Sequence, residues 1–365
     1  MHEDILQPTL SEADFDERFR QLHDQLWCTV EVAFDDVTSH VLAPPKGFYL
    51  VDHSFLHDGE NWHMYYVTGD MTLTDQWQVH RLAGEYEEAN EVTPEPGNGH
   101  AVGRTLFDLS FVENVFFESQ GRFDLMSRAA CSLFRFRDRY GMLYDVRGNL
   151  GEVMSLAWSE DLYAWRLDER NPVLLQPSWA NPRGAFKDPH IMEYEGIYLI
   201  FAVAWTQPGE VAICLITTED WKTFHDQGTV FQAPPALRGT FGFESPQVIL
   251  RDGLWHLFYT HGPGLYHSIS PSPAGFLSPP ATARAGKVQR GSYFMGPFHA
   301  TELVEDRGQW WLTTDRKEET RRLNRTVGRM CARGSYDDEK TLEEGLYIAG
   351  VRWEGDQPVL EKPAQ

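Results

Sequence analysis

One short pattern occurs five times along the chain. In each copy a glycine precedes an aromatic-rich stretch, as in GENWHMYYV and GLWHLFYT. The glycines are Gly59, Gly141, Gly196, Gly253 and Gly308, and the last three intervals between them are 55, 57 and 55 residues. Glycine suits the tight turn of a hairpin, and aromatic residues suit β-strands. Units of this length fit four-stranded blades, so the repeat predicts an all-β fold, a five-bladed β-propeller.

The chain is predicted to divide into three segments. Residues 1–44 are predicted to form a helical extension, because Ser11 and Asp14 have capping-box spacing and Phe15, Phe19, Leu22 and Leu26 recur at helical intervals. The propeller is predicted over 45–335, and a closing strand (Leu346 to Trp353) with a tail over 336–365. The first interval is longer, 82 residues, which predicts an insertion in the polar stretch from Asp70 to Gly99.

Composition excludes several classes of partner. The chain carries 32 Lys and Arg against 54 Asp and Glu, a formal net charge of −22, which argues against binding nucleic acid or an anionic membrane.

Its N-terminus lacks the basic start and apolar stretch of a signal peptide, and no run is apolar enough to span a membrane. A cytoplasmic location is expected, although a mature secreted form remains open. The four cysteines form no CxxC pair and are expected to be reduced and buried.

Three acidic residues precede the hairpin glycines at similar distances. Asp52 lies seven residues before Gly59, Asp188 eight before Gly196, and Glu244 nine before Gly253. The innermost strand of each blade runs along the central channel, so these carboxylates are predicted to meet at one mouth. In the comparable places, blade five has His299 and blade two has Ala129 and Ala130.

Clustered carboxylates raise one another's pKa and destabilise a fold, a cost that usually serves a function. Cleavage of a glycosidic bond needs such a set, in which one carboxyl is protonated and another ionised. Aromatic side chains are also suited to packing against the C–H groups of a sugar ring. The predicted function is therefore hydrolysis of a glycoside.

Three segments resemble those of five-bladed glycoside hydrolases. VDHSFLHDGENWHMYY resembles the first-blade segment of family 43, in which a catalytic Asp opens the strand, with His53 in place of the usual Pro. FKDPHIMEYEGIYLIF is similar to the Arg-Asp-Pro segment of families 32 and 68, with Lys187 in place of Arg. FESPQVILRDGLWHLFY resembles the segment of the acid Glu. The resemblance extends from about residue 45 to residue 320.

The resemblance implies a role for each site residue. Asp52 becomes the base or nucleophile, Asp188 the stabiliser of the transition state and Glu244 the general acid, with His53 and Lys187 as substrate contacts. Lys is a point charge where Arg is a planar fork, which weakens the case for a fructosyl substrate. His299 resembles a fifth-blade histidine that helps to hold calcium in family 43. A buried structural role is equally open for His299, and no cofactor is required.

Three functions remain in competition on the sequence. The preferred one is a hydrolase of small oligosaccharides or glycosides acting on a furanoside or pentose unit, such as arabinofuranose, fructofuranose or xylose. The second is a glycoside phosphorylase of the related five-bladed type, which needs clustered basic residues at the channel mouth. The third is a non-catalytic sugar-binding propeller. The N-terminal helix could cover the bottom face or form the contact of a homo-oligomer.

Overall fold

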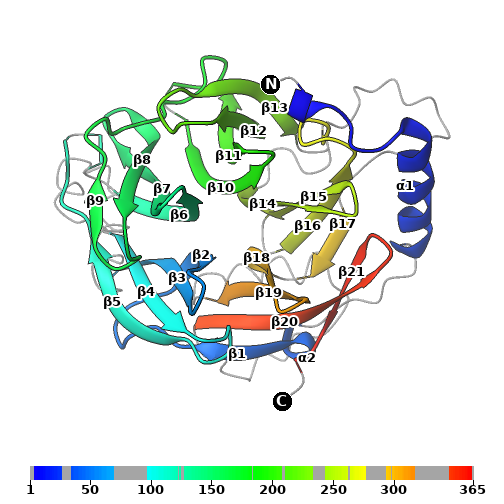
Figure 1. Cartoon of the computed structure of the whole chain (residues 1–365), viewed down its shortest axis with the longest axis horizontal. Helices are drawn as coiled ribbons and strands as arrows, with labels where there is room; N and C mark the ends of the chain where they lie inside the picture. Colours follow the sequence, from blue (N-terminus) through cyan, green and yellow to red (C-terminus); the bar gives the residue numbers. More distant parts are fainter. Residues whose placement is uncertain are drawn as a thin grey trace.

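The protein is a five-bladed β-propeller with an N-terminal helix at its rim (Figure 1). The structure, a computed structural model, describes residues 4–26, 34–69, 97–121, 123–124, 127–182, 184–207, 210–232, 243–261, 264–276, 293–296, 298–316 and 345–363. The predicted fold class is confirmed. Most of the expected insertion, residues 70–96, lies outside the described residues, and 97–99 belong to a strand of blade one.

Each blade is an antiparallel sheet, and blades one to four follow chain order from the axis outward. Blade one contains β2 (Val51–His57), β3 (Trp62–Thr68), β4 (Gly97–Gly103) and β5 (Ser110–Phe116). Blade two contains β6 (Ser127–Phe136), β7 (Arg139–Gly148), β8 (Gly151–Ser159) and β9 (Trp165–Leu167). Blade three contains β10 (Phe186–Tyr194), β11 (Ile197–Gln207), β12 (Glu210–Thr218) and β13 (His225–Gln232). Blade four contains β14 (Phe243–Arg251), β15 (Leu254–His261), β16 (Gly264–Ser270) and β17 (Tyr293–Gly296).

Four of the five repeated glycines form hairpin turns as predicted. They lie between the first and second strands with positive φ, which glycine adopts at little cost, and they are Gly59, Gly196, Gly253 and Gly308. Gly141 differs because it lies within β7, opposite Phe134. A Cβ atom on Gly141 would lie 2.0 Å from the Phe134 ring, so this glycine makes room for an aromatic side chain instead of a turn.

Both ends of the chain complete blade five. Its inner strands are β18 (His299–Asp306) and β19 (Gln309–Arg316), followed by β20 (Gly345–Glu354), which includes the predicted closing strand. The outer edge of β20 pairs with β1 (Thr38–Leu42) along one half and with β21 (Gln357–Glu361) along the other. Segments outside 45–335 thus supply three strands of the propeller, and their pairing closes the ring.

The N-terminal helix packs beside blade four (Figure 1). A 3-10 turn, η1 (Asp4–Leu6), precedes α1 (Glu12–Leu26), and a short α2 (Phe34–Val37) precedes β1. Ser11 caps α1 by accepting a hydrogen bond from the Asp14 backbone N–H at 3.1 Å. Phe15 is buried against Leu254, and Arg18 donates hydrogen bonds to Asp356 and to the carbonyl of Asp252. Asp252 lies in the turn between β14 and β15, so Arg18 joins α1 to the end of blade four that is remote from Glu244.

The side chains of Phe19, Leu22 and Leu26, which helped to predict this helix, lie outside the described set. Within the part of the chain that the structure describes, no helix is long and apolar enough to cross a membrane. Cys131 and Cys214 are free and buried, as predicted, whereas Cys28 and Cys331 lie outside the described residues.

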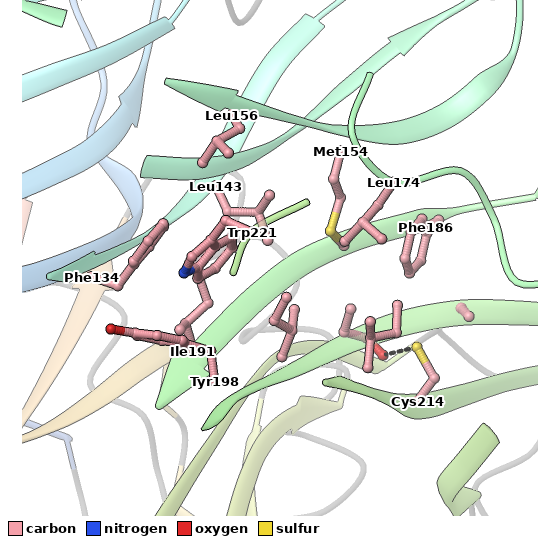
Figure 2. Packing of buried hydrophobic residues seen from close by; sticks show 14 of the residues in the cluster. Phe134, Leu143, Met154, Leu156, Leu174, Phe186, Ile191, Tyr198, Cys214 and Trp221 are labelled. Atoms are coloured by element: carbon pink, nitrogen blue, oxygen red, sulfur yellow. Dashed lines mark hydrogen bonds between the residues drawn. The ribbon is translucent and has the colours of Figure 1, made fainter. Parts of the chain in front are cut away.

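Apolar side chains from neighbouring blades pack together between the sheets. Figure 2 shows the cluster between blades two and three, in which Trp221 stacks on Phe134 with ring centroids 3.7 Å apart. Trp221 has a φ of 58°, and its N–H donates to Thr218 Oγ1 at 3.0 Å. Leu162 occupies the corresponding place in blade two, with a φ of 63° and its N–H bonded to Ser159 Oγ at 2.9 Å. A hydroxyl-capped turn thus buries a large apolar residue at both places.

Blades one and four each contain a buried pair of histidines. Nδ1 of His63 lies 3.0 Å from Nε2 of His100, and Nδ1 of His256 lies 2.9 Å from Nε2 of His267. Each pair is diagonal between the second and third strands of its blade. Burial lowers the pKa of His100 and of His256 to about 3, so these rings are neutral in the folded protein.

These pairs predict a loss of stability in mild acid. The unfolded chain protonates its histidines near pH 6.5, whereas the folded chain holds these rings neutral, so the unfolded state binds more protons below that pH. The free energy of unfolding is expected to fall by up to about 1.4 kcal/mol per pH unit for each such histidine. Urea unfolding at about four pH values between 8 and 5 measures how the free energy of unfolding changes with pH, for the wild type and for His267→Gln. Equal slopes would contradict the prediction.

Candidate active site

The first strand of every blade carries a β-bulge near its N-terminal end. The register shifts after Val51, Arg128, Lys187, Glu244 and His299. In four blades the next residue has positive φ: 41° at Asp52, 53° at Asp188, 49° at Ser245 and 42° at Ala300. Left-handed conformations are uncommon for residues other than glycine, and bulges commonly redirect side chains at functional sites. The bulges therefore mark one mouth of the channel as the candidate site.

The predicted common position of the three acids divides into two adjacent positions. Asp52 and Asp188 both follow the register shift, at the place that Ser245 occupies in blade four. Glu244 lies one residue earlier, level with Lys187 and His299. This one-residue difference is why Glu244 lies nine residues before its hairpin glycine and Asp188 lies eight before its own. The bulge nevertheless brings side chains from both positions together, as their contacts show.

Ser245 links two of the carboxylates. Its backbone N–H donates to Asp188 Oδ2 at 2.9 Å, and its hydroxyl donates to Asp52 Oδ1 at 2.8 Å. Lys187 joins the third, because its Nζ lies 3.0 Å from Glu244 Oε1 and 3.3 Å from Asp188 Oδ2. Asp52, Asp188 and Glu244, which lie on three different blades, are thus connected through two neighbouring side chains.

His299 reaches the same cluster from blade five. Its Nε2 lies 3.4 Å from Glu244 Oε2, and its Nδ1 lies 3.0 Å from Asp315 Oδ1. Asp315 is the residue directly opposite His299 on β19, and its side chain is fully buried. Glu244 is more open than His299, with 43% of its side chain exposed against 14%.

Two acids of the cluster come from second strands, where the sequence pattern did not point. Asp315 is one, and Asp145 on β7 is the other: its Oδ1 accepts a hydrogen bond from the Asp188 N–H at 3.3 Å. Asp145 lies across from the bulge of Ala129 and Ala130, so blade two does contribute a carboxylate. Both acids lie at the level of the bulge in the first strand of their blade. Pairing the two strands across the hairpin turn would have identified them only if the extra residue of the bulge had been known.

Burial and crowding raise the pKa of two carboxyls. Burial is the largest cause of the raised pKa of Asp52; the charge of His299 opposes it, and the charges of Asp315 and Glu244 add to it. Burial likewise raises the pKa of Asp188 to about 6, against the opposing charge of Lys187. Both groups therefore hold a proton more readily than an exposed Asp.

Glu244 has the opposite environment. The positive charge of Lys187 lowers its pKa far below the usual range, against the effect of burial and with help from a hydrogen bond to His299. Burial disfavours the charged form of His299, but Asp315, Glu244 and Asp52 together raise its pKa well above 6.5. Lys187 also has a raised pKa, because Asp188 and Glu244 outweigh its burial. The substrate-free site thus contains an ionised Glu244 between two cations.

The predicted calcium contact of His299 does not fit this geometry. Both ring nitrogens face carboxylates, Nε2 toward Glu244 and Nδ1 toward Asp315, so neither is directed at an open position for a metal. Across the described residues, no group of three or more His, Cys, Asp or Glu side chains is arranged to hold a metal ion. His299 is instead one member of a row of alternating charges.

His53 lies in the channel beside the carboxylates. Its Nε2 is 2.7 Å from Thr313 Oγ1, and burial lowers its pKa to about 3. With Asp52 and Asp188 it lines a cavity of about 40 Å³, large enough for a few water molecules. Glu302 lines the same cavity and accepts a hydrogen bond from the Phe55 N–H at 2.9 Å, and burial raises its pKa to about 8. Nothing in the sequence pattern pointed to Glu302.

No protein-family model and no curated protein matches this sequence. Solved structures do match its fold. A family 32 β-fructofuranosidase from Bombyx mori has a TM-score of 0.59 at 14% identity, covering 97% of this chain and 70% of the other. A sucrose-6-phosphate hydrolase from Lactobacillus gasseri has a TM-score of 0.62 at 11% identity, covering 99% and 69%. A thermostable family 43 glycoside hydrolase has a TM-score of 0.58 at 12% identity, covering 88% and 96%.

At these identities the likeness concerns the fold. The resemblance predicted from three sequence segments is confirmed at that level, because the similar structures include family 32 and family 43 glycoside hydrolases with a propeller of this kind. Fold alone does not determine a reaction, so the chemistry has to be argued from the cluster at the channel mouth.

Proposed function

We propose that the protein is a glycoside hydrolase that cleaves the bond of a furanoside or pentose unit, such as arabinofuranose, fructofuranose or xylose. One observation carries this proposal: Asp52, Asp188 and Glu244, from three blades, meet at one mouth of the channel with their charges held by shared partners. The similar solved structures named above, all glycoside hydrolases, support the same reaction class.

Each carboxyl has a role that its surroundings support. The Glu244 side chain is 43% exposed, which suits a general acid that must reach a leaving oxygen. Asp52 is fixed by Ser245 and acts as base or nucleophile, and Asp188 stabilises positive charge that develops on the sugar ring. Lys187 keeps Asp188 and Glu244 in place, and contacts substrate hydroxyl groups together with His53.

The raised pKa values predict an unusual acid limb in the pH profile. Asp52 and Asp188 must both be ionised, and protonation of either removes a required charge. Since the pKa of Asp188 is about 6 and that of Asp52 is also raised, kcat/KM is expected to fall as pH drops through about 6. A pH profile measured with an aryl glycoside checks this, and constant kcat/KM down to a pH of about 4, near the pKa of an ordinary Asp, would contradict it.

A substrate screen tests the proposal directly. Aryl arabinofuranosides, xylosides and fructosides are incubated with the protein, with and without phosphate, and the product anomers are followed by NMR. Release of free sugar without phosphate is the expected result. Turnover only with phosphate would indicate a phosphorylase, and binding without turnover would indicate a sugar-binding propeller.

The described residues at the channel mouth already weigh against the phosphorylase. Lys187 and His299 are the basic side chains of the cluster, and both are engaged by carboxylates. Neither of these two described cations is left without carboxylate partners to receive a phosphate dianion.

A further inference from the structure

The charges around Glu244 raise a question about its role as the acid. A general acid must carry a proton when the leaving oxygen departs. Glu244 is instead ionised in the substrate-free site, with Lys187 Nζ 3.0 Å from Oε1 and His299 Nε2 3.4 Å from Oε2. His299 Nε2 faces Oε2 directly, so the geometry offers a neighbouring side chain as the source of the proton that Glu244 donates.

We propose that His299, held by Asp315, passes the proton on its Nε2 to Glu244, which delivers it to the leaving oxygen of the glycoside. The proposal rests on the proposed hydrolase function and adds two positioning residues to it. Neither His299 nor Asp315 has to touch the substrate, because both act through Glu244.

Geometry separates His299 from Lys187 as the proton source. His299 Nε2 faces Glu244 Oε2, while Nδ1 is held by both oxygens of Asp315, at 3.0 and 3.2 Å, so the ring is oriented along a line from Asp315 to Glu244. The Thr314 hydroxyl donates to the His299 carbonyl at 2.8 Å and fixes the backbone there. Lys187 is also bound to two carboxylates, but the ordinary pKa of an ammonium is about four units above that of an imidazole, so Lys187 retains its proton at neutral pH.

Four strands at the channel mouth place charged or titratable groups around His299. Asp315 on β19 and Glu244 on β14 are in contact with it, and Asp52 on β2 adds a further negative charge. His53 on β2 is neutral and buried. Lys187 on β10 is the remaining cation of the cluster, and it contacts Glu244 at the other oxygen. The acids outnumber the cations, which keeps the imidazolium charged until a substrate changes the balance.

The proton balance closes over one turnover. Substrate binding displaces water from Glu244, and the proton moves from His299 Nε2 to Glu244 Oε2, leaving a neutral imidazole and a neutral carboxyl. Glu244 then protonates the leaving oxygen as the C–O bond breaks. Water adds to the sugar, directly or through a covalent intermediate on Asp52, and loses one proton, while His299 regains one from solvent. The net reaction consumes the glycoside and one water.

Two measurements test this proposal. The first is NMR of the His299 ring in the resting wild-type protein, where the imidazole is expected to remain doubly protonated above pH 7, on the order of one unit above an ordinary histidine. The second is the pH profile of His299→Gln. Glu244 must then hold the proton alone beside Lys187, so the alkaline limb of kcat/KM is expected to move down by at least about one pH unit.

The leaving group provides the control for a structural role. A dinitrophenyl glycoside needs little acid assistance, so His299→Gln should keep its rate within about threefold on that substrate and lose at least about tenfold at pH 7 on an alkyl glycoside. Asp315→Asn keeps the hydrogen bond to His299 without the charge. It should move the alkaline limb of kcat/KM to lower pH, by less than His299→Gln does. His57→Gln, at the exposed end of β2, should change neither the alkaline limb of kcat/KM nor the rate on either leaving group.

The outcomes separate this proposal from the proposed function. If the wild type hydrolyses glycosides but His299 is neutral at pH 7, or His299→Gln loses activity equally at every pH and with both leaving groups, the proton transfer is wrong and the hydrolase remains. If the wild type hydrolyses no glycoside, the proposed function and the proton transfer both fail.

Discussion

Glu244→Gln and Asp52→Asn are each expected to lower kcat by about 100- to 10,000-fold, the range over which positioned acids and bases act. Gln cannot deliver a proton to the leaving oxygen, and Asn cannot accept one from water or form a glycosyl ester. Kinetics with the best substrate of the aryl glycoside panel measure both losses. The loss for Glu244→Gln should shrink on a dinitrophenyl glycoside, whereas the loss for Asp52→Asn should not.

Stability provides the control for these two variants. The pKa of Asp52 is raised because its charged form is buried among other acids, so Asn should leave the free energy of unfolding at neutral pH unchanged or higher. Circular dichroism and urea unfolding verify the fold. Activity within about tenfold of wild type in either folded variant would remove that residue from the assigned role.

Trp221→Ala is expected to lower the free energy of unfolding by about 3 to 5 kcal/mol, the usual cost of removing a buried tryptophan side chain. Trp221 is fully buried between blades two and three, where it stacks on Phe134 and packs near Tyr198 (Figure 2). Its removal leaves a cavity in the interface between two sheets whose strands cannot easily move together. Urea unfolding monitored by far-ultraviolet circular dichroism measures the loss.

The corresponding turn of blade two supplies the matched control. Leu162 fills the same position there, so Trp221→Leu keeps an apolar side chain that this turn accommodates and should cost clearly less than Trp221→Ala. Leu175→Ala, at a side chain that is 58% exposed, should cost no more than about 0.5 kcal/mol. Equal losses for Trp221→Ala and Leu175→Ala would contradict the packing described for Trp221.

The propeller could be predicted from sequence because each blade repeats the same local signals. Gly196, Gly253 and Gly308 mark turns that require positive φ, and the aromatic strands after them supply the packing between blades. These signals depend on residues close together in the chain. The strand β1 (Thr38–Leu42) has no such mark, because its place in blade five depends on pairing with β20 some 300 residues later.

The candidate site was predictable in part for the same reason. Asp52, Asp188 and Glu244 could be found because each precedes a hairpin at a nearly constant distance. Asp145 and Asp315 could not, since they enter the cluster from second strands and their position depends on a bulge in the first. The charge state of Glu244 was also hidden, because Lys187 and His299 approach it from neighbouring blades.

The most direct test of the central claim is the fate of oxygen during turnover in heavy-oxygen water. Mass spectrometry of the sugar released from the best aryl glycoside should show one heavy oxygen atom in the free sugar, with the signal lost in Asp52→Asn and Glu244→Gln. Three results would contradict a hydrolase built on these carboxylates. They are release of an unlabelled sugar phosphate, no release of sugar from any glycoside, and release of labelled sugar by both variants at the wild-type rate.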